Sequence, residues 1–172
     1  FGTSVTRLGD LDGDGIADLV LIHRGRVEYW PGLGHGRFGS RIRMGTLAGF
    51  PDAASALDLR RVHLADLDGS GCADLVYIAL DHLLVWFNRS GNGWSDPVEI
   101  RGTPLTPTGD TVRFTDILAA GIGAVVWSST AAGGGHGMWS ALDLFGGEKP
   151  HLISSIDNSI GAVTRIAFAS SA

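Results

Sequence analysis

Short apolar runs alternate along this chain with turns rich in Gly and Asp. The two clearest runs, 19–22 and 75–78, contain mostly β-branched, aromatic and other large apolar residues. Runs of this length and composition are typical of buried strands. The segments between them show no convincing helical periodicity, which argues against a parallel α/β arrangement. The pattern therefore predicts an all-β fold.

One acidic segment occurs twice. Residues 10–18 read DLDGDGIAD and residues 66–74 read DLDGSGCAD, a shift of 56 positions (66 minus 10). The same shift places Trp86 on Trp30, so the similarity extends beyond the segment itself. We therefore interpret the chain as built from repeated structural units.

A third unit follows at a further shift of 50, which places 112–116 on 62–66 and 125–127 on 75–77. Its acidic segment has degenerated. Only Asp116 keeps a carboxylate, and three apolar residues stand where the second unit has Asp68, Ser70 and Asp74: Leu118, Ala120 and Ala124. We assign no metal to this unit.

The order of strands and turns within a unit predicts the architecture. In the second unit we expect strands at 62–66, 74–79, 83–88 and 94–101. Four antiparallel strands every 50 or so residues are typical of a β-propeller blade. We therefore predict three four-stranded blades, with residues 49–61 as an interblade connection. The predicted domains are blade 1 (1–48), blade 2 (49–104), a degenerate blade 3 (105–150) and an exit segment (151–172).

Propellers close with about four to eight blades, so three blades cannot complete a ring. We expect the chain to be an arc of a larger propeller, with the other blades as its neighbours; the alternative is that it associates through its exposed blade faces. It begins at Phe1 rather than Met and shows no charged-then-apolar leader. It is therefore expected to be a piece of a longer polypeptide.

The two acidic loops are predicted to bind calcium. Clustered carboxylates repel one another, and a hard cation with oxygen ligands relieves that repulsion. A helix-loop-helix calcium site would need Glu at its twelfth position, which here is Leu21 or Tyr77. The loops therefore lie between strands, with Gly13 and Gly15 supplying positive φ angles in the first.

The predicted ligands follow the alternating pattern of each loop, with a backbone carbonyl contributing at Ile16 and at Cys72. Ser70 replaces an acid, so we expect weaker binding in the second loop. A tight Asp/Gly turn without an ion is the alternative. The candidate metal ligands are Asp10, Asp12, Asp14, Ile16 and Asp18 in the first loop, and Asp66, Asp68, Ser70, Cys72 and Asp74 in the second.

Charge and composition exclude several classes of protein. The net charge is −5, but seven of the 18 acids lie in the two loops, which leaves 11 acids against 13 Lys and Arg. A basic nucleic-acid surface is therefore not indicated. The longest apolar stretch, 117–127, is too short to cross a bilayer, so we expect no membrane insertion. The single cysteine, Cys72, permits no internal disulfide.

Other residues show no catalytic or zinc-binding arrangement. The six histidines are scattered, no Gly-x-Ser-x-Gly elbow occurs, and 133–137 is predicted to be a flexible Gly-rich hairpin. We therefore expect no enzyme activity. Aromatic residues recur at repeat-related positions, where we expect them to pack one blade against the next, with sugar stacking as the alternative. They are Trp30, Trp86, Trp127 and Trp139 on strands, and Phe38 and Trp94 after Gly turns.

The first two units resemble the FG-GAP or VCBS repeats of integrin-α-like propellers. The likeness rests on the pattern Phe/Leu-x-Asp-x-Asp-Gly-(Asp/Ser)-Gly-x-x-Asp-Leu-Val, followed by a strand and a Gly-x-Gly turn that leads into Phe38 or Trp94. In that family the acidic loop joins two strands of a blade and holds calcium. The resemblance implies the same role for both loops here.

A narrower resemblance rests on 85–94, which reads VWFNRSGNGW, and on 152–166, with its Asp-Asn-x-x-Gly-Ala-x-Thr element. These segments are similar to the last propeller blades and the exit segment of toxin-complex B components, related to SpvB and RHS-type shell proteins. Ser159 departs from the Asn-Gly-x-Gly that this family typically shows. The resemblance implies that 157–172 begins the shell and that 162–168 is a strand without its partners.

This resemblance also implies a function. It suggests a secreted virulence protein in which the propeller docks onto a pore-forming A component and gates an enclosed cargo. We therefore expect a non-catalytic, calcium-binding scaffold module with a protein partner. The alternative is an integrin-like adhesion or carbohydrate-binding propeller, in which a blade face meets a protein or a glycan.

Overall fold

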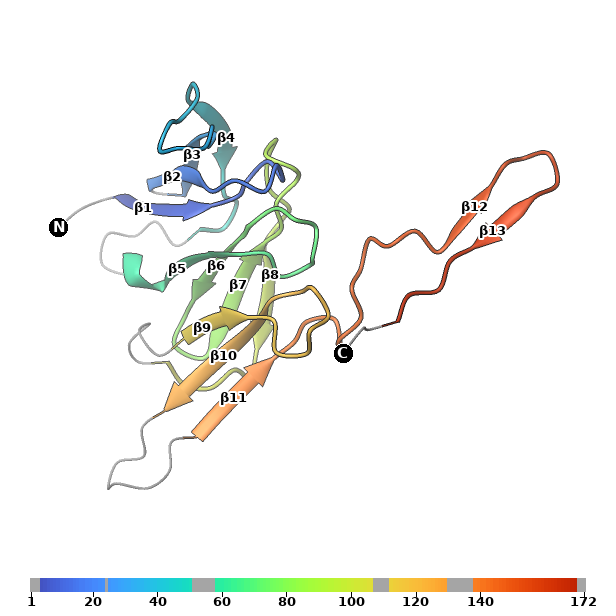
Figure 1. Cartoon of the computed structure of the whole chain (residues 1–172). Helices are drawn as coiled ribbons and strands as arrows, with labels where there is room; N and C mark the ends of the chain where they lie inside the picture. The colour runs from blue at the N-terminus through green and yellow to red at the C-terminus, as the bar shows by residue number, and fades with distance from the viewer. Residues whose placement is uncertain (1–3, 24, 51–57, 107–111, 130–137, 170–172) are drawn as a thin grey trace.

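The computed structural model describes residues 4–23, 25–50, 58–106, 112–129 and 138–169. Within these ranges the regular structure is β, apart from the 3-10 turn η1 (Leu59–Arg61). Three antiparallel sheets stand one after another, and a two-stranded hairpin projects away from them (Figure 1). Each of the three sheets lies within one predicted blade, and the hairpin lies within the predicted exit segment. The boundaries of these four domains stay a prediction.

The first two sheets have the same up-and-down order. Their strands pair with their sequence neighbours, as in a propeller blade. Blade 1 contains β1 (Ser4–Gly9), β2 (Asp18–His23), β3 (Arg26–Trp30) and β4 (Ile42–Thr46). Blade 2 contains β5 (Val62–Ala65), β6 (Asp74–Ile78), β7 (His82–Trp86) and β8 (Val98–Arg101).

The repeat is visible in the pairing register. Leu19 pairs with Trp30 in blade 1, and Leu75 pairs with Trp86 in blade 2. Isolated bridges at equivalent places join Gly32 to Phe38 and Asn88 to Trp94. The 56-residue shift therefore aligns three-dimensional structure as well as sequence.

Blade 3 departs from the prediction of four strands. In the part of the chain that the structure describes it has three, β9 (Val112–Thr115), β10 (Ala124–Ser129) and β11 (Met138–Leu142). The chain after β11 turns instead of returning along the sheet, with positive φ angles at Gly146 and Gly147. The predicted Gly-rich hairpin at 133–137 lies outside the described residues.

The exit segment forms a hairpin of β12 (Ser155–Asp157) and β13 (Val163–Arg165). The expectation of an unpaired strand at 162–168 was therefore wrong, because 155–157 supplies its partner. Both strands are exposed throughout.

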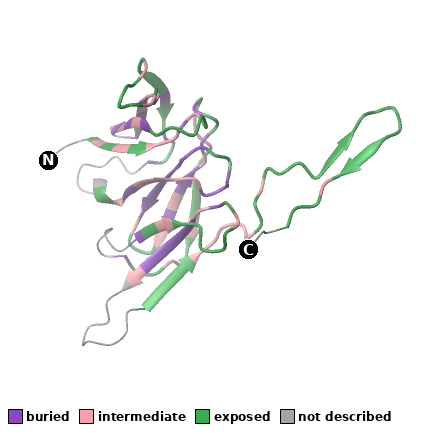
Figure 2. Cartoon of the chain, viewed as in Figure 1, coloured by how far each residue is buried: buried purple, intermediate pink, exposed green. Residues whose placement is uncertain are grey.

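Blade 2 is buried on both faces, which explains why all five residues of β6 are buried (Figure 2). Successive side chains of a strand point to opposite sides. Leu75 and Tyr77 pack against blade 1, in a cluster that includes Val20 and Ile22. Val76 belongs to a second cluster, shared with blade 3. The core is therefore two interblade layers with blade 2 between them.

The tryptophans divide between core and surface. Trp86 is fully buried, and its Nε1 donates a hydrogen bond to the Ala48 carbonyl at 2.8 Å. Trp127 is buried in the second cluster and donates to Thr106 Oγ1. Trp139 is 71% exposed, so none of the described blades covers it and its packing against a next blade stays a prediction. It lies on β11, beyond which the described chain provides no further blade.

The two tryptophans give a matched test. Trp86→Ala removes a fully buried indole, so we expect it to lower the free energy of unfolding by about 3–5 kcal/mol. Trp139→Ala should change it by about 0.5 kcal/mol or less. Equilibrium denaturant unfolding of both variants measures the difference. Equal losses would contradict the assignment of Trp86 to the interblade core.

His63 lies in the second interblade region, with its ring centroid 5.3 Å from that of Phe114. Its buried Nε2 finds no hydrogen-bond partner among the residues that the structure describes. Burial, followed by the positive charge of Arg7, lowers the pKa of His63 to about 4. The folded chain therefore resists protonation of this ring.

This environment predicts a pH dependence. The unfolded chain protonates His63 near pH 6.5 but the folded chain only near 4, so stability is complete above about 6.5 and falls as the pH drops towards 4. His63→Phe should flatten this part of the profile of melting temperature against pH. The control, His35→Asn, changes an exposed histidine and should keep the parent slope. An unchanged slope in His63→Phe would count against the prediction.

Candidate metal centre

The first acidic loop joins β1 to β2 and is held by its own aspartates. Asp18, the first residue of β2, is fully buried; its Oδ2 accepts the Leu11 N–H at 2.8 Å and its Oδ1 accepts the Gly32 N–H at 2.8 Å. Asp10 accepts the N–H groups of Gly13 and Gly15, each at 2.7 Å. These carboxylates satisfy backbone donors that the irregular loop would otherwise leave unpaired.

Gly13 and Gly15 adopt positive φ angles, as the sequence predicts. Gly13 and Gly15 have φ angles of 84° and 85°, and their counterparts Gly69 and Gly71 have 69° and 89°. Side chains with a Cβ rarely adopt this region.

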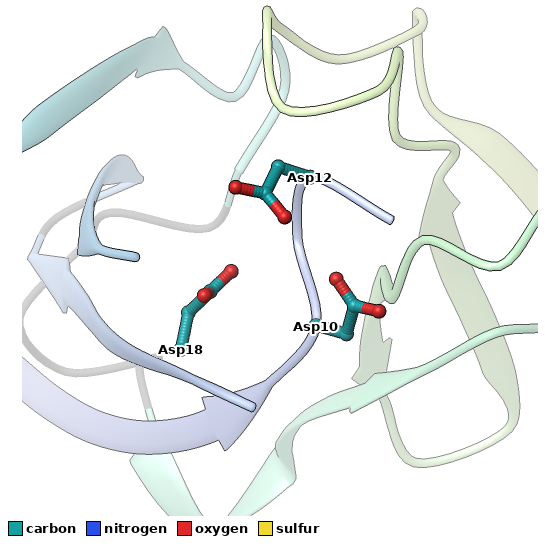
Figure 3. Close-up of side chains that lie close together, drawn as sticks. All are labelled: Asp10, Asp12 and Asp18. Carbon is teal, nitrogen blue, oxygen red and sulfur yellow. The ribbon is translucent and has the colours of Figure 1, made fainter. Parts of the chain in front are cut away.

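Three carboxylates of the first loop converge. One oxygen each of Asp10, Asp12 and Asp18 lies within 4.8 Å of the others, and Figure 3 shows the three groups surrounding one space. Burial, and then the charge of Asp18, raises the pKa of Asp12. Asp14 is not in this group; it is exposed, and its Oδ1 accepts the Ile16 N–H at 2.7 Å.

The second loop, between β5 and β6, repeats this arrangement. Asp66, Asp68 and Asp74 again bring three oxygens within 4.8 Å of one another. Asp74 is fully buried and accepts the N–H groups of Leu67 and Asn88 at 2.9 and 2.8 Å. Its burial raises the pKa of Asp74 to about 7. A charge at this position is therefore costly unless a cation accompanies it.

The remaining predicted ligands of the second loop lie close by. Ser70 Oγ accepts the Cys72 N–H at 3.3 Å and is 3.5 Å from the Cys72 carbonyl oxygen. The Cys72 thiol is buried. The exit segment reaches this loop too, because His151 Nε2 lies 3.3 Å from Asp68 Oδ2.

The third loop separates structural from metal-binding roles. Asp116 accepts the N–H groups of Leu118, Ala120 and Gly121, at distances from 2.8 to 3.3 Å, as the first aspartate does in the other loops. No second carboxylate joins it among the residues that form this loop. The first aspartate of a loop therefore shapes the backbone without needing an ion.

The donor set in the first two loops fits calcium. Calcium takes oxygen ligands at about 2.3–2.6 Å, so two ligand oxygens on one ion are separated by at most about 5 Å. The oxygens of each group satisfy that limit. A carboxylate oxygen that accepts one N–H retains a lone pair for a cation.

Sequence reasoning missed Asn88. Its side-chain Nδ2 donates to the carbonyls of Leu11 and Ala73, at 2.9 and 3.0 Å, and its Oδ1 accepts the Gly91 N–H. Asn88 aligns with Gly32 in the first unit. That difference in an otherwise similar repeat was the signal available.

Comparison with known proteins identifies the repeats. The family model of the FG-GAP-like repeat matches residues 10–77, which contain both acidic loops. Residues 10–77 are therefore similar to FG-GAP-like repeats. This confirms the resemblance drawn from the loop sequence. No curated protein matches the chain.

Solved structures extend the likeness over most of the chain. The pore of the Photorhabdus luminescens Tc holotoxin is 31% identical, with a TM-score of 0.75, over 94% of this chain and 7% of that one. A TcdB2-TccC3 complex without its hypervariable C-terminal region is 34% identical, again at 0.75, over 94% and 7%. The resemblance to toxin-complex proteins is thereby confirmed, and so are the propeller blades. The chain spans less than a tenth of those relatives.

A third structure shares the fold alone. An Agrocybe aegerita lectin that recognises non-reducing terminal N-acetylglucosamine is 20% identical, with a TM-score of 0.57, over 88% of this chain and 41% of that one. Separately, no helix among the described residues has the length and apolar character needed to span a bilayer.

The third loop gives a test of the structural role. Asp116→Ala removes the acceptor of three backbone N–H groups, so we expect a lower melting temperature. The decrease should be the same in calcium and in EDTA, because no ion is assigned there. A decrease seen only in calcium would show that this loop binds the ion.

Proposed function

We propose that this chain is a non-catalytic, calcium-binding arc of a β-propeller that serves as a scaffold and binding module in a toxin complex. The observation that carries the calcium assignment is the pair of carboxylate groups, built at the same corner of two successive blades. Its place in a toxin complex rests on the likeness to Tc complexes over 94% of the chain.

In this proposal each loop folds around one ion. Asp10, Asp12 and Asp18 would hold the first, with Asp14 and the carbonyl of Ile16 completing its shell. Asp66, Asp68 and Asp74 would hold the second, with Ser70 and the carbonyl of Cys72. The bound ion supplies positive charge that neutralises the clustered carboxylates. The first loop should bind more tightly, because Asp14 is replaced by the neutral Ser70.

The scaffold role follows from what the patterned residues already do. The buried aspartates of the loops accept backbone N–H groups, so they are committed to holding the blades. A catalytic acid or base would need a carboxylate free to meet a substrate. This distribution supports a structural role over an enzymatic one.

We infer that the partners are proteins. The outer faces of blades 1 and 3 present apolar side chains, including Leu8 at 65% exposure and Trp139 at 71%. Blade 2 buries the equivalent faces against its neighbours, so further blades of the same propeller fit here. By the same likeness to Tc complexes, the assembly is secreted and docks onto a pore-forming component.

Calcium should stabilise the folded chain. Each site contributes about 2.7 kcal/mol when the free ion is at about 100 times its dissociation constant. We therefore expect a higher melting temperature in calcium than in EDTA, by scanning calorimetry. Asp12→Asn should reduce the difference, and Ser70→Asp should strengthen binding in the second loop.

Asp96→Asn serves as the control, because Asp96 is an exposed aspartate outside both loops. It should retain the full response to calcium. Identical melting temperatures of the parent chain in calcium and in EDTA would refute the calcium assignment.

A further inference from the structure

Three buried hydrogen bonds, linked through Leu11 and Asn88, connect the two acidic loops. Asp18 of the first loop accepts the Leu11 N–H at 2.8 Å, and the Leu11 carbonyl accepts Asn88 Nδ2 at 2.9 Å. The Asn88 N–H donates in turn to Asp74 Oδ1 of the second loop at 2.8 Å. All four residues are buried, with exposures of 8% or less. Leu11 and Asn88 each take part in two of these bonds, so a shift of either residue displaces a bond partner in both loops.

A second connection runs through the turn after β7. Asn88 Oδ1 accepts a hydrogen bond from the Gly91 N–H at 2.9 Å, and Gly91 packs against Asp12 of the first loop. A Cβ on Gly91 would lie 2.7 Å from the Tyr29 hydroxyl and 3.3 Å from Asp12 Cβ, and its φ is 75°. Asn88 thus connects to two residues of the first group, Asp12 and Asp18, through one neighbour each.

The third blade provides an internal contrast. A backbone bond between neighbouring loops recurs: the Ala73 N–H donates to the Asp10 carbonyl at 2.6 Å, and the Gly123 N–H donates to the Asp66 carbonyl at 3.0 Å. The side-chain bridge does not recur. Leu142 pairs with Val125 as Trp86 pairs with Leu75, so Leu144, two residues later, occupies the place of Asn88 and packs on the second apolar cluster. The amide occurs where both neighbouring loops carry a carboxylate group.

We propose that Asn88 couples the two calcium sites, so that an ion in either loop strengthens binding in the other. The inference rests on the proposed function, because it needs an ion in both loops. An ion in the first loop fixes Asp12 and Asp18, and through them Leu11, Gly91 and Asn88. Asp74 is then already ordered when the second ion arrives, so less conformational entropy is lost.

The test is a calorimetric titration of the 172-residue chain with calcium. Disabling the first loop by Asp12→Asn with Asp14→Asn should weaken binding in the second by about 5- to 20-fold. Disabling the second loop by Asp68→Asn should weaken the first by the same factor, because coupling is reciprocal. In Asn88→Ala both factors should shrink to about twofold or less.

Two further variants make the test specific. Asn92→Ala changes an exposed asparagine of the same turn, whose Nδ2 donates to the Ser90 carbonyl, and should preserve the coupling. Asn88→Leu introduces the residue found in blade 3 and should abolish it. Circular dichroism establishes that each variant is folded.

The outcomes separate this inference from the function on which it rests. If the parent chain binds calcium at both loops with independent affinities, the coupling is overturned and the calcium assignment stands. This outcome needs no Asn88 variant. Coupling that persists in folded Asn88→Ala or Asn88→Leu would overturn the role of Asn88. No calcium binding by the parent chain would overturn the proposed function, and this inference with it.

Discussion

The structure depends on keeping three carboxylates within 4.8 Å of one another at the corner of a blade. Like charges so close repel, and burial of Asp74 raises its pKa to about 7. The loop offsets part of this cost by aiming backbone N–H groups at the carboxylates. A divalent cation would offset the rest. The same aspartates that create the repulsion also hold the loop in shape, so the proposed ion would bind to the groups that already fold the loop.

Hydrogen bonds connect each of the first two loops to the strands of its own blade and to the next blade. Asp18 and Asp74 begin the second strand of their blades, and each accepts an N–H from beyond the third strand, at Gly32 and Asn88. Each of the first two loops also accepts, at its first carbonyl, an N–H from the next blade. Together with the two apolar layers on either side of blade 2, these bonds fix the spacing of successive blades.

Much of this arrangement could be predicted from sequence because it is local and repeated. The 56-residue shift, the positive φ angles of Gly13 and Gly15, and the strands around each loop follow from spacing and residue type. The described part of blade 3 has three strands where the repeat predicted four; extrapolating the repeat gave no weight to the turn at Gly146 and Gly147. The partner of the strand at 163–165 was missed although it lies nearby in sequence, at 155–157, because neither short strand has the apolar run that marks the other strands. Asn88 was missed because its partner Leu11 is 77 residues away.

The most direct test is a crystal structure of this chain grown in calcium, with anomalous scattering used to locate the ion. The account predicts one peak in each of the first two loops, each with carboxylate oxygens at about 2.3–2.6 Å, and none beside Asp116. Solvent alone between the three carboxylates of both loops would contradict it.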